Sequence, residues 1–294
     1  MAVLAAKDVC LSTEDGELAV HRFERATGSS PSGAVVVVFH GYGAHARFPT
    51  VRYAAELLAL QGDVVYSLDF PGHGASPGTR GLVRSSEQLT TIGRAMARWA
   101  TAAQPGRALV LFGSSMGGAI ALNVCRREPG IVATCVVAAP MLGIAPASLP
   151  PVWQQNLLWG LAWLAPAAAV LPQANQSDLS QQYRDPVRRA EVAADELAYS
   201  GWMRVGSACA CLETAIELSE HFEEISTPFL CLAAGKDTVV DTAGPAKLMA
   251  RSMTAPEHKK LVEFPEALHG LLCEPMPSRS EIEVAVVEWV AKYR

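Results

Sequence analysis

The sequence comprises 294 residues, of which 50% are hydrophobic and 18% are charged, and its formal net charge is -5. This composition excludes intrinsic disorder, which requires low hydrophobicity and high net charge. The acidic balance, without any run of Lys or Arg, argues against nucleic acid as a main partner and against attraction to anionic membrane lipid by charge.

The N-terminal part predicts a β-hairpin, because short strands at 8–11 and 17–23 flank an Asp-Gly pair. The run AVVVVF at 34–39 then has the composition of a strand buried on both faces. Similar apolar strands alternate with helical stretches, which predicts an α/β fold with a mostly parallel sheet and helices on both faces. The predicted strands are 34–39, 64–68, 108–112, 132–138, 229–233 and 260–264, and the predicted helices are 51–61, 86–103, 116–127, 243–253 and 281–294.

One long segment, 141–224, interrupts this alternation and contains no convincing buried strand. It holds four of the six tryptophans, namely Trp153, Trp159, Trp163 and Trp202. We interpret it as a helical subdomain inserted between two strands, so that residues 1–140 and 225–294 together form the core.

The most apolar part of this insertion is 157–171, with the sequence LLWGLAWLAPAAAVL. At 15 residues, and broken by Pro166, it is too short for a confident membrane span. Two interpretations remain open. The stretch is either a buried or pocket-lining helix, or an apolar surface that contacts lipid or an aggregated substrate.

The chain contains seven cysteines, an odd number, and several lie in apolar runs. Buried reduced thiols fit this pattern better than a disulfide framework does. Cys209 and Cys211 have no second Cys or His pair nearby, so we expect no zinc site and no other cofactor. The N-terminus reaches Lys7 and Asp8 too soon for the apolar region of a signal peptide. We therefore expect a cytoplasmic protein.

The sharpest motif is Gly113-Ser114-Ser115-Met116-Gly117, a G-x-S-x-G between a predicted strand and a predicted helix. In this context a serine is held as a nucleophile at the carboxyl end of a sheet. The turn is so tight that the positions two before and two after the serine have almost no room for side chains, and glycine meets this need. We predict Ser115 as the nucleophile, and Ser114 is a weaker candidate because it lies one position off the centre.

A serine nucleophile needs a base and an acid that orients the base, and in this chain order both follow the serine. His269 lies in the loop after the last predicted strand, at the carboxyl edge of the sheet, and is the predicted base. Asp237 follows the preceding strand in the same way and is the predicted acid. Asp241 is the competing candidate, but its position also suits a cap for the helix that begins near Ala243.

The negative oxygen of a tetrahedral intermediate needs two backbone N–H donors. One donor is expected from Met116, the residue after the nucleophile. The other is expected from Tyr42, in a glycine-containing loop (40–45, HGYGAH) after the strand 34–39. His40 is interpreted as a brace of this loop, and His45 is given no role.

With these residues assigned, the chain resembles the α/β-hydrolase superfamily and, within it, the monoglyceride lipase/lysophospholipase branch, often grouped as serine aminopeptidase-like hydrolases. The resemblance implies that 141–224 is a helical cap over the active site. It also implies that Tyr183, in Tyr183-Arg184-Asp185-Pro186, reaches the polar end of the substrate. Plant esterases that act on phenylpropanoid esters are similar in the same places. The motifs that carry the resemblance are HGYGAH at 40–45, DFPGHGAS at 69–76, GSSMGG at 113–118, GKD at 235–237 and the late His269.

We predict a metal-free serine hydrolase that cleaves carboxylic esters through an acyl-enzyme, with monoacylglycerol or lysophospholipid as the first substrates to consider. Three alternatives remain: an acyltransferase with the same triad, a phenylpropanoid-type esterase, and a ligand-binding receptor without turnover. Membrane contact, if any, is peripheral and falls on 157–171.

Overall fold

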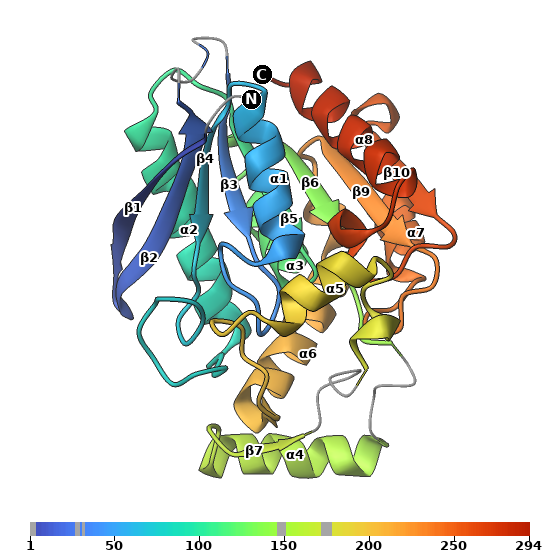
Figure 1. Ribbon diagram of the computed structural model, residues 1–294. Helices are drawn as coiled ribbons and strands as arrows, with labels where there is room; N and C mark the ends of the chain where they lie inside the picture. Colours follow the sequence, from blue (N-terminus) through green and yellow to red (C-terminus); the bar gives the residue numbers. More distant parts are fainter. Residues whose placement is uncertain (1–3, 27–29, 31–32, 146–150, 172–177) are drawn as a thin grey trace.

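The computed structural model describes residues 4–26, 30, 33–145, 151–171 and 178–294. In this part of the chain an eight-stranded sheet has the order β1-β2-β4-β3-β5-β6-β9-β10 (Figure 1). The first two strands form an antiparallel hairpin, and β2 joins the sheet antiparallel to β4. The neighbours from β4 to β10 all pair in parallel. The strands are β1 (Leu4–Thr13), β2 (Gly16–Arg25), β3 (Val35–Phe39), β4 (Val64–Leu68), β5 (Leu109–Ser114), β6 (Val132–Ala138), β9 (Phe229–Ala234) and β10 (Lys259–Phe264).

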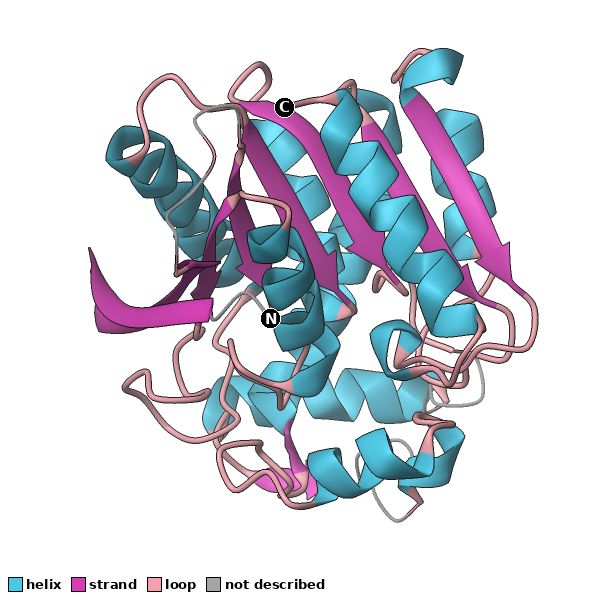
Figure 2. Cartoon of the chain, turned by 45° about the horizontal axis from the view of Figure 1, so that its top comes forward, coloured by secondary structure: helices cyan, strands magenta, loops and turns pink. Residues whose placement is uncertain are grey.

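Helices cover both faces of the sheet, as predicted (Figure 2). Along β3, the side chains of Val35 and Val37 pack in the same cluster as those of α2 and α3, while Val36 packs in the cluster of α1 and α8. Strand side chains alternate between the two faces, so a central strand between two helical layers must be apolar at every position. The helices of the core are α1 (Pro49–Leu60), α2 (Ser86–Ala103), α3 (Met116–Arg127), α7 (Gly244–Arg251) and α8 (Ser278–Lys292), with short 3-10 helices at Pro256–His258 and Leu271–Cys273. A further 3-10 helix, Phe222–Glu224, ends the segment 141–224.

The last strand differs from its prediction as a buried strand. In β10 only Phe264 is buried, and Lys260 and Glu263 are exposed. β10 lies at the edge of the sheet and pairs with β9 alone among the described strands. Charged side chains on an edge strand discourage pairing with another chain, which explains why this run is less apolar than β3.

The segment 141–224 lies at the carboxyl ends of the parallel strands, where Figure 1 shows α4 and β7 farthest from the sheet. Its described part is mainly helical, as predicted, and adds a two-stranded antiparallel pair, β7 with β8. Residues 146–150 and 172–177 of the predicted cap lie outside the described residues. The elements are α4 (Val152–Leu164), β7 (Ala169–Leu171), a 3-10 helix at Leu179–Gln181, α5 (Pro186–Ala193), β8 (Met203–Arg204) and α6 (Val205–Glu220).

All seven cysteines are free, and six of them are buried, which agrees with the interpretation as reduced thiols. Cys10, on β1, is the exposed exception. Within the described residues, no helix is both long enough and apolar enough to cross a bilayer.

Candidate active site

Ser115 occupies the sharp turn between β5 and α3. Its backbone lies at φ 56° and ψ -120°, a strained conformation for a residue with a side chain. A Cβ on Gly113 would lie 2.2 Å from the carbonyl oxygen of Gly117, and a Cβ on Gly117 would lie 2.1 Å from that of Phe39. The turn therefore excludes side chains two residues before and after Ser115, as the spacing predicts.

His269 and Asp237 meet at the same edge of the sheet. The Nδ1 of His269 lies 2.7 Å from the Oδ2 of Asp237, and the two residues follow the neighbouring strands β10 and β9. The other carboxylate oxygen of Asp237 accepts the N–H groups of Val239 and Val240 at 2.8 and 3.1 Å. Burial acts to raise the pKa of Asp237, but the charge and hydrogen bond of His269 and these two N–H groups outweigh it and hold the pKa below its ordinary value.

Asp241, the competing candidate for the acid, has other partners. It accepts the N–H of Ala243 at 3.0 Å, just before α7, and lies 3.3 Å from the ammonium group of Lys247. The structure thus brings Asp237, and not Asp241, to the imidazole.

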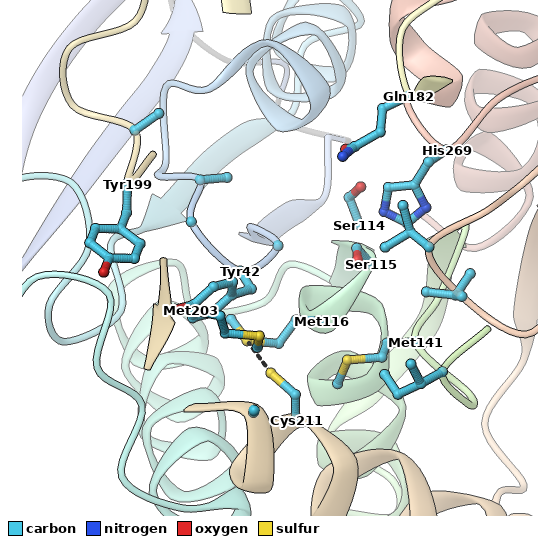
Figure 3. A pocket seen from close by; sticks show the side chains of 18 of the residues that line it. Tyr42, Ser114, Ser115, Met116, Met141, Gln182, Tyr199, Met203, Cys211 and His269 are labelled. Carbon is cyan, nitrogen blue, oxygen red and sulfur yellow. Dashed lines mark hydrogen bonds between the residues drawn. The ribbon is translucent and has the colours of Figure 1, made fainter. Parts of the chain in front are cut away.

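Ser115 and His269 both line a cavity of about 740 Å³ beneath the segment 141–224. Figure 3 shows Ser114, Ser115 and His269 on the same side of this cavity. Ser114 also borders it, but Ser115 has the strained backbone that directs a nucleophile outward. One cavity therefore brings together a serine on a strained turn and a histidine that is paired with an acid.

The loop after β3 approaches the serine closely. A Cβ on Gly41 would lie 3.2 Å from the Cβ of Ser115 and 3.7 Å from its Oγ, so the main chain passes directly beside the nucleophile. The Tyr42 hydroxyl donates to the carbonyl of Gly81 at 2.8 Å, and the main-chain N–H of Tyr42 directly follows Gly41 in this loop. Among the described residues, neither this N–H nor that of Met116 has an acceptor.

His40 braces this loop, as predicted. It is fully buried, its Nε2 accepts the N–H of Phe70 at 3.0 Å, and its Nδ1 donates to the carbonyl of Gly41 at 2.8 Å. Burial, together with the nearby charge of His73, lowers the pKa of His40 to about 3, so the ring stays neutral. A neutral ring can accept and donate at the same time, as this position requires.

Tyr183 lies on the cavity wall next to the histidine loop. Its ring packs so closely on Gly270 that a Cβ there would lie 2.5 Å from the Tyr183 ring. The residue is buried, and burial raises the pKa of its phenol. This position agrees with the expectation that it reaches substrate, which stays a prediction.

A contact that the sequence did not predict joins His45 to the segment 141–224. The Nε2 of His45 lies 2.9 and 3.0 Å from the two carboxylate oxygens of Asp195, which itself borders the cavity. The two residues are 150 positions apart in the chain, so no local pattern could have revealed the pair.

α4 combines the two interpretations that the sequence left open. Leu158 and Trp159 line the cavity. No residue of the helix is fully buried. Its other side presents Trp153, Leu157 and Trp163 to solvent, with exposures of 62%, 65% and 84%. One face of α4 therefore forms a wall of the cavity and the other is an unpartnered apolar surface among the described residues.

The cavity carries little charge. Among its described lining residues there is no Lys or Arg, and Asp195 is the one carboxylate. The residues that the structure does not describe are all uncharged in sequence. The nearby guanidinium groups of Arg80 and Arg204 donate to main-chain carbonyls. Within the described residues, no group of His, Cys, Asp and Glu could hold a metal ion.

Comparisons with known proteins agree with this geometry. A family model described as "Serine aminopeptidase, S33" matches residues 30–276. The monoacylglycerol lipase of Mycolicibacterium smegmatis is 28% identical over 247 residues, covering 84% of this chain and 84% of that protein. The caffeoylshikimate esterase of Arabidopsis thaliana is 24% identical over 283 residues, covering 95% of this chain and 83% of that protein.

Solved structures share the same architecture. The crystal structure of the Paleococcus ferrophilus monoacylglycerol lipase superposes with a TM-score of 0.79 at 23% identity, covering 95% of this chain and 100% of that chain. A soluble variant of the Saccharomyces cerevisiae monoglyceride lipase superposes with a TM-score of 0.82 at 18% identity, covering 100% of this chain and 95% of that chain.

Proposed function

The chain belongs to the serine aminopeptidase (S33) family, and from this membership we propose that it hydrolyses carboxylic esters through Ser115, Asp237 and His269. The predicted α/β-hydrolase fold and the family resemblance are confirmed. The observation that carries the catalytic proposal is the buried Asp237–His269 pair on the same cavity as the strained Ser115. The family description names a peptidase, but a fold-level label does not assign the substrate, and the curated relatives reported above are ester hydrolases.

The proposed reaction proceeds in two steps. His269 takes the proton of Ser115 Oγ as that oxygen attacks the ester carbonyl, and the N–H groups of Tyr42 and Met116 bind the negative oxygen. His269 then gives the proton to the leaving alcohol as the ester C–O bond breaks. The alcohol departs, and the acyl group stays on Ser115. In the second step a water molecule, deprotonated by His269, attacks the acyl group, and the carboxylic acid leaves as Ser115 takes back its proton. Asp237 holds the imidazole in orientation and stabilises its charged form.

We propose a neutral ester as the substrate, with monoacylglycerol first. The lining of the cavity is mostly apolar, which suits an acyl chain. A lysophospholipid carries a phosphate and a shikimate ester carries a carboxylate, and each would enter a cavity whose described lining offers no cation. Asp195 would also repel such anions, since charges interact strongly where water is excluded. Lysophospholipids and shikimate esters therefore rank below monoacylglycerol.

We further propose that 141–224 is a cap on a core formed by 1–140 and 225–294, and that its α4 contacts lipid. The exposed face with Trp153, Leu157 and Trp163 is the support for this contact. Large aromatic and aliphatic side chains on a surface helix bind at the boundary between headgroups and acyl chains. The protein would then work in the cytoplasm and associate peripherally with membranes or with aggregated substrate.

Hydrolysis of a matched pair of lipids tests the proposal. The wild-type protein should release fatty acid from monoacylglycerol at least about tenfold faster than from lysophosphatidate with the same acyl chain, and Asp195→Asn should narrow this gap. Ser115→Ala should release none from either lipid. A protein that binds monoacylglycerol without turnover would contradict the hydrolase proposal. Addition of a competing alcohol distinguishes hydrolysis from acyl transfer, which would yield the new ester as the main product.

A further inference from the structure

Glu274 is a buried carboxylate that the proposed reaction does not use. The residue is 0% exposed and lies five positions after His269, beyond the short helix at Leu271–Cys273. Its Oε1 accepts the N–H of Leu268, the residue directly before His269, at 2.9 Å. Glu274 therefore holds the main chain of the loop that carries the base.

The second oxygen of Glu274 faces the cap. The Nη2 of Arg184 lies 2.6 Å from Glu274 Oε2, and its Nη1 donates to the carbonyl of Glu266 at 3.1 Å. Arg184 thus connects to the histidine loop both directly, at Glu266, and through Glu274, at Leu268.

The residues just before Arg184 contact the other side of the base. The carbonyl of Gln182 accepts the N–H of Gly270 at 2.9 Å, and the Tyr183 ring packs on Gly270. Gln182 and Tyr183 also line the cavity. The short cap stretch 182–184 therefore contacts the loop on both sides of His269 while it borders the space that a substrate would occupy.

An ion pair with one buried member, such as Glu274 with the partly exposed Arg184, is weak evidence of stabilisation, because desolvation of the buried charge offsets the attraction. An arrangement that fixes one loop in place can instead affect the rate of the reaction, since a displacement of about 1 Å at a reacting group costs roughly 100-fold in rate. Glu274 has two partners: the N–H of Leu268, in the loop of the predicted base, and Arg184, which itself donates to the carbonyl of Glu266 in that loop.

We propose that Arg184 and Glu274 are positioning residues, which hold the His269 loop against the cap so that the imidazole stays aligned with Ser115. The inference rests on the proposed function, because it assigns the base to His269. It adds that the cap, besides enclosing the substrate, sets the geometry of the catalytic group.

The test compares Arg184→Met, Arg184→Lys, Glu274→Gln and the double variant Arg184→Met/Glu274→Gln. A fluorophosphonate titrates the active sites, so that kcat is expressed per functional site and a loss of folded protein does not enter it. We expect Arg184→Met to lower kcat per site by about tenfold or more with KM within about twofold, and Arg184→Lys to recover most of the loss. Arg184→Met already removes both connections of Arg184, and Gln at position 274 can still accept the N–H of Leu268, so the double variant should be no slower than Arg184→Met.

A matched control removes a different contact between cap and core. Glu191, on α5, pairs with Arg52 and Tyr53 on α1 and does not border the cavity. Glu191→Gln should leave kcat per site within about twofold of the wild type.

Two results would overturn the inference. One is a loss confined to thermal stability or to the titrated fraction, with kcat per site unchanged in Arg184→Met and Glu274→Gln. The other is additive losses in the double variant. If Arg184→Met does not fold, kcat per site is compared between Arg184→Lys and Glu274→Gln. A lower kcat per site in Glu274→Gln supports the inference, and an unchanged kcat per site in both variants overturns it. Failure of the proposed function is a separate result, because the wild type would then show no turnover that depends on Ser115.

Discussion

The Nδ1 of His269 lies 2.7 Å from the Oδ2 of Asp237, and both side chains are largely withdrawn from solvent. The two residues are 32 positions apart and meet because β9 and β10 are parallel neighbours whose carboxyl ends face the same cavity. The distance fits a charge-assisted hydrogen bond, in which an ionised acid fixes the tautomer of a histidine.

Replacement of Asp237 by Asn should therefore reduce ester hydrolysis strongly. In a serine triad the amide favours the wrong imidazole tautomer, and we expect kcat to fall by about 10³–10⁴-fold. Steady-state hydrolysis of a p-nitrophenyl ester measures the effect. Asp241→Asn is the matched control, because this nearby carboxylate pairs with Lys247, and its activity should stay within about twofold of the wild type. Equal losses of kcat in Asp237→Asn and Asp241→Asn would contradict the assignment of Asp237 as the acid that orients His269.

The sequence predicts this part of the molecule well because the geometry is local. Ser115 is flanked by glycines that the turn itself requires, and α3 spans Met116–Arg127 as expected. The order of strands along the chain then identifies the loops of Asp237 and His269, since every parallel strand delivers its carboxyl end to one edge.

Other features could not be predicted because they depend on contacts between distant segments. Lys260–Phe264 looks like the other apolar strands, and its partial exposure follows from its place at the sheet edge. The pair His45–Asp195 and the contact of Arg184 with Glu274 join residues 150 and 90 positions apart, and neither leaves a periodic signal. The apolar composition of α4 likewise does not reveal which face meets the cavity.

The sharp turn around Ser115 leads to a prediction about stability. Gly117→Ala would place a Cβ 2.1 Å from the carbonyl oxygen of Phe39, so backbone must move, and we expect a loss of about 3 kcal/mol or more in the free energy of unfolding. Gly160→Ala in α4 is the control, because nothing lies within 4 Å of its added Cβ and alanine favours a helix. Chemical denaturation of both variants measures the difference. Similar free energies of unfolding for Gly117→Ala and Gly160→Ala would show that the turn has room for a side chain at position 117, which would contradict this account.

Acid should destabilise the fold through His73. Burial, together with the charge of Arg80, lowers the pKa of this histidine to about 4, whereas the unfolded chain protonates near the ordinary value of ~6.5. The stabilisation is fully present above pH 6.5 and is lost as the pH falls from there towards about 4, at roughly 1.4 kcal/mol per pH unit.

Denaturation of the wild type and of His73→Gln across this range measures that contribution, together with the effect of His73 on His40, whose ring centroid lies 5.3 Å away. His40 and His21 are present in both proteins: the pKa of His40 is lowered, so His40 acts in the same direction as His73, whereas the pKa of His21 is raised, so His21 acts in the opposite direction. The difference between the two proteins should shrink as the pH falls. A constant difference from pH 7 to pH 4.5 would show that His73 does not stay neutral in the fold.

Lipid contact by α4 should depend on its exposed tryptophans. Trp163 is 84% exposed and Trp153 is 62% exposed, and exchange of both for Gln should lower binding to uncharged phosphatidylcholine vesicles by about tenfold or more. Vesicle flotation measures the bound fraction. Met253→Gln is the control, because Met253 is also largely exposed, at 70%, but lies on the core after α7. Binding that falls equally in the control would indicate nonspecific adhesion.

The most direct test of the proposed catalysis is the site of a fluorophosphonate adduct, located by peptide mass spectrometry. The proposal predicts a single adduct on Ser115, which is absent in Ser115→Ala and forms at least about 100-fold more slowly in His269→Gln, because the base that activates the hydroxyl is then missing. An adduct on another residue, or equal labelling of the wild type and Ser115→Ala, would contradict it.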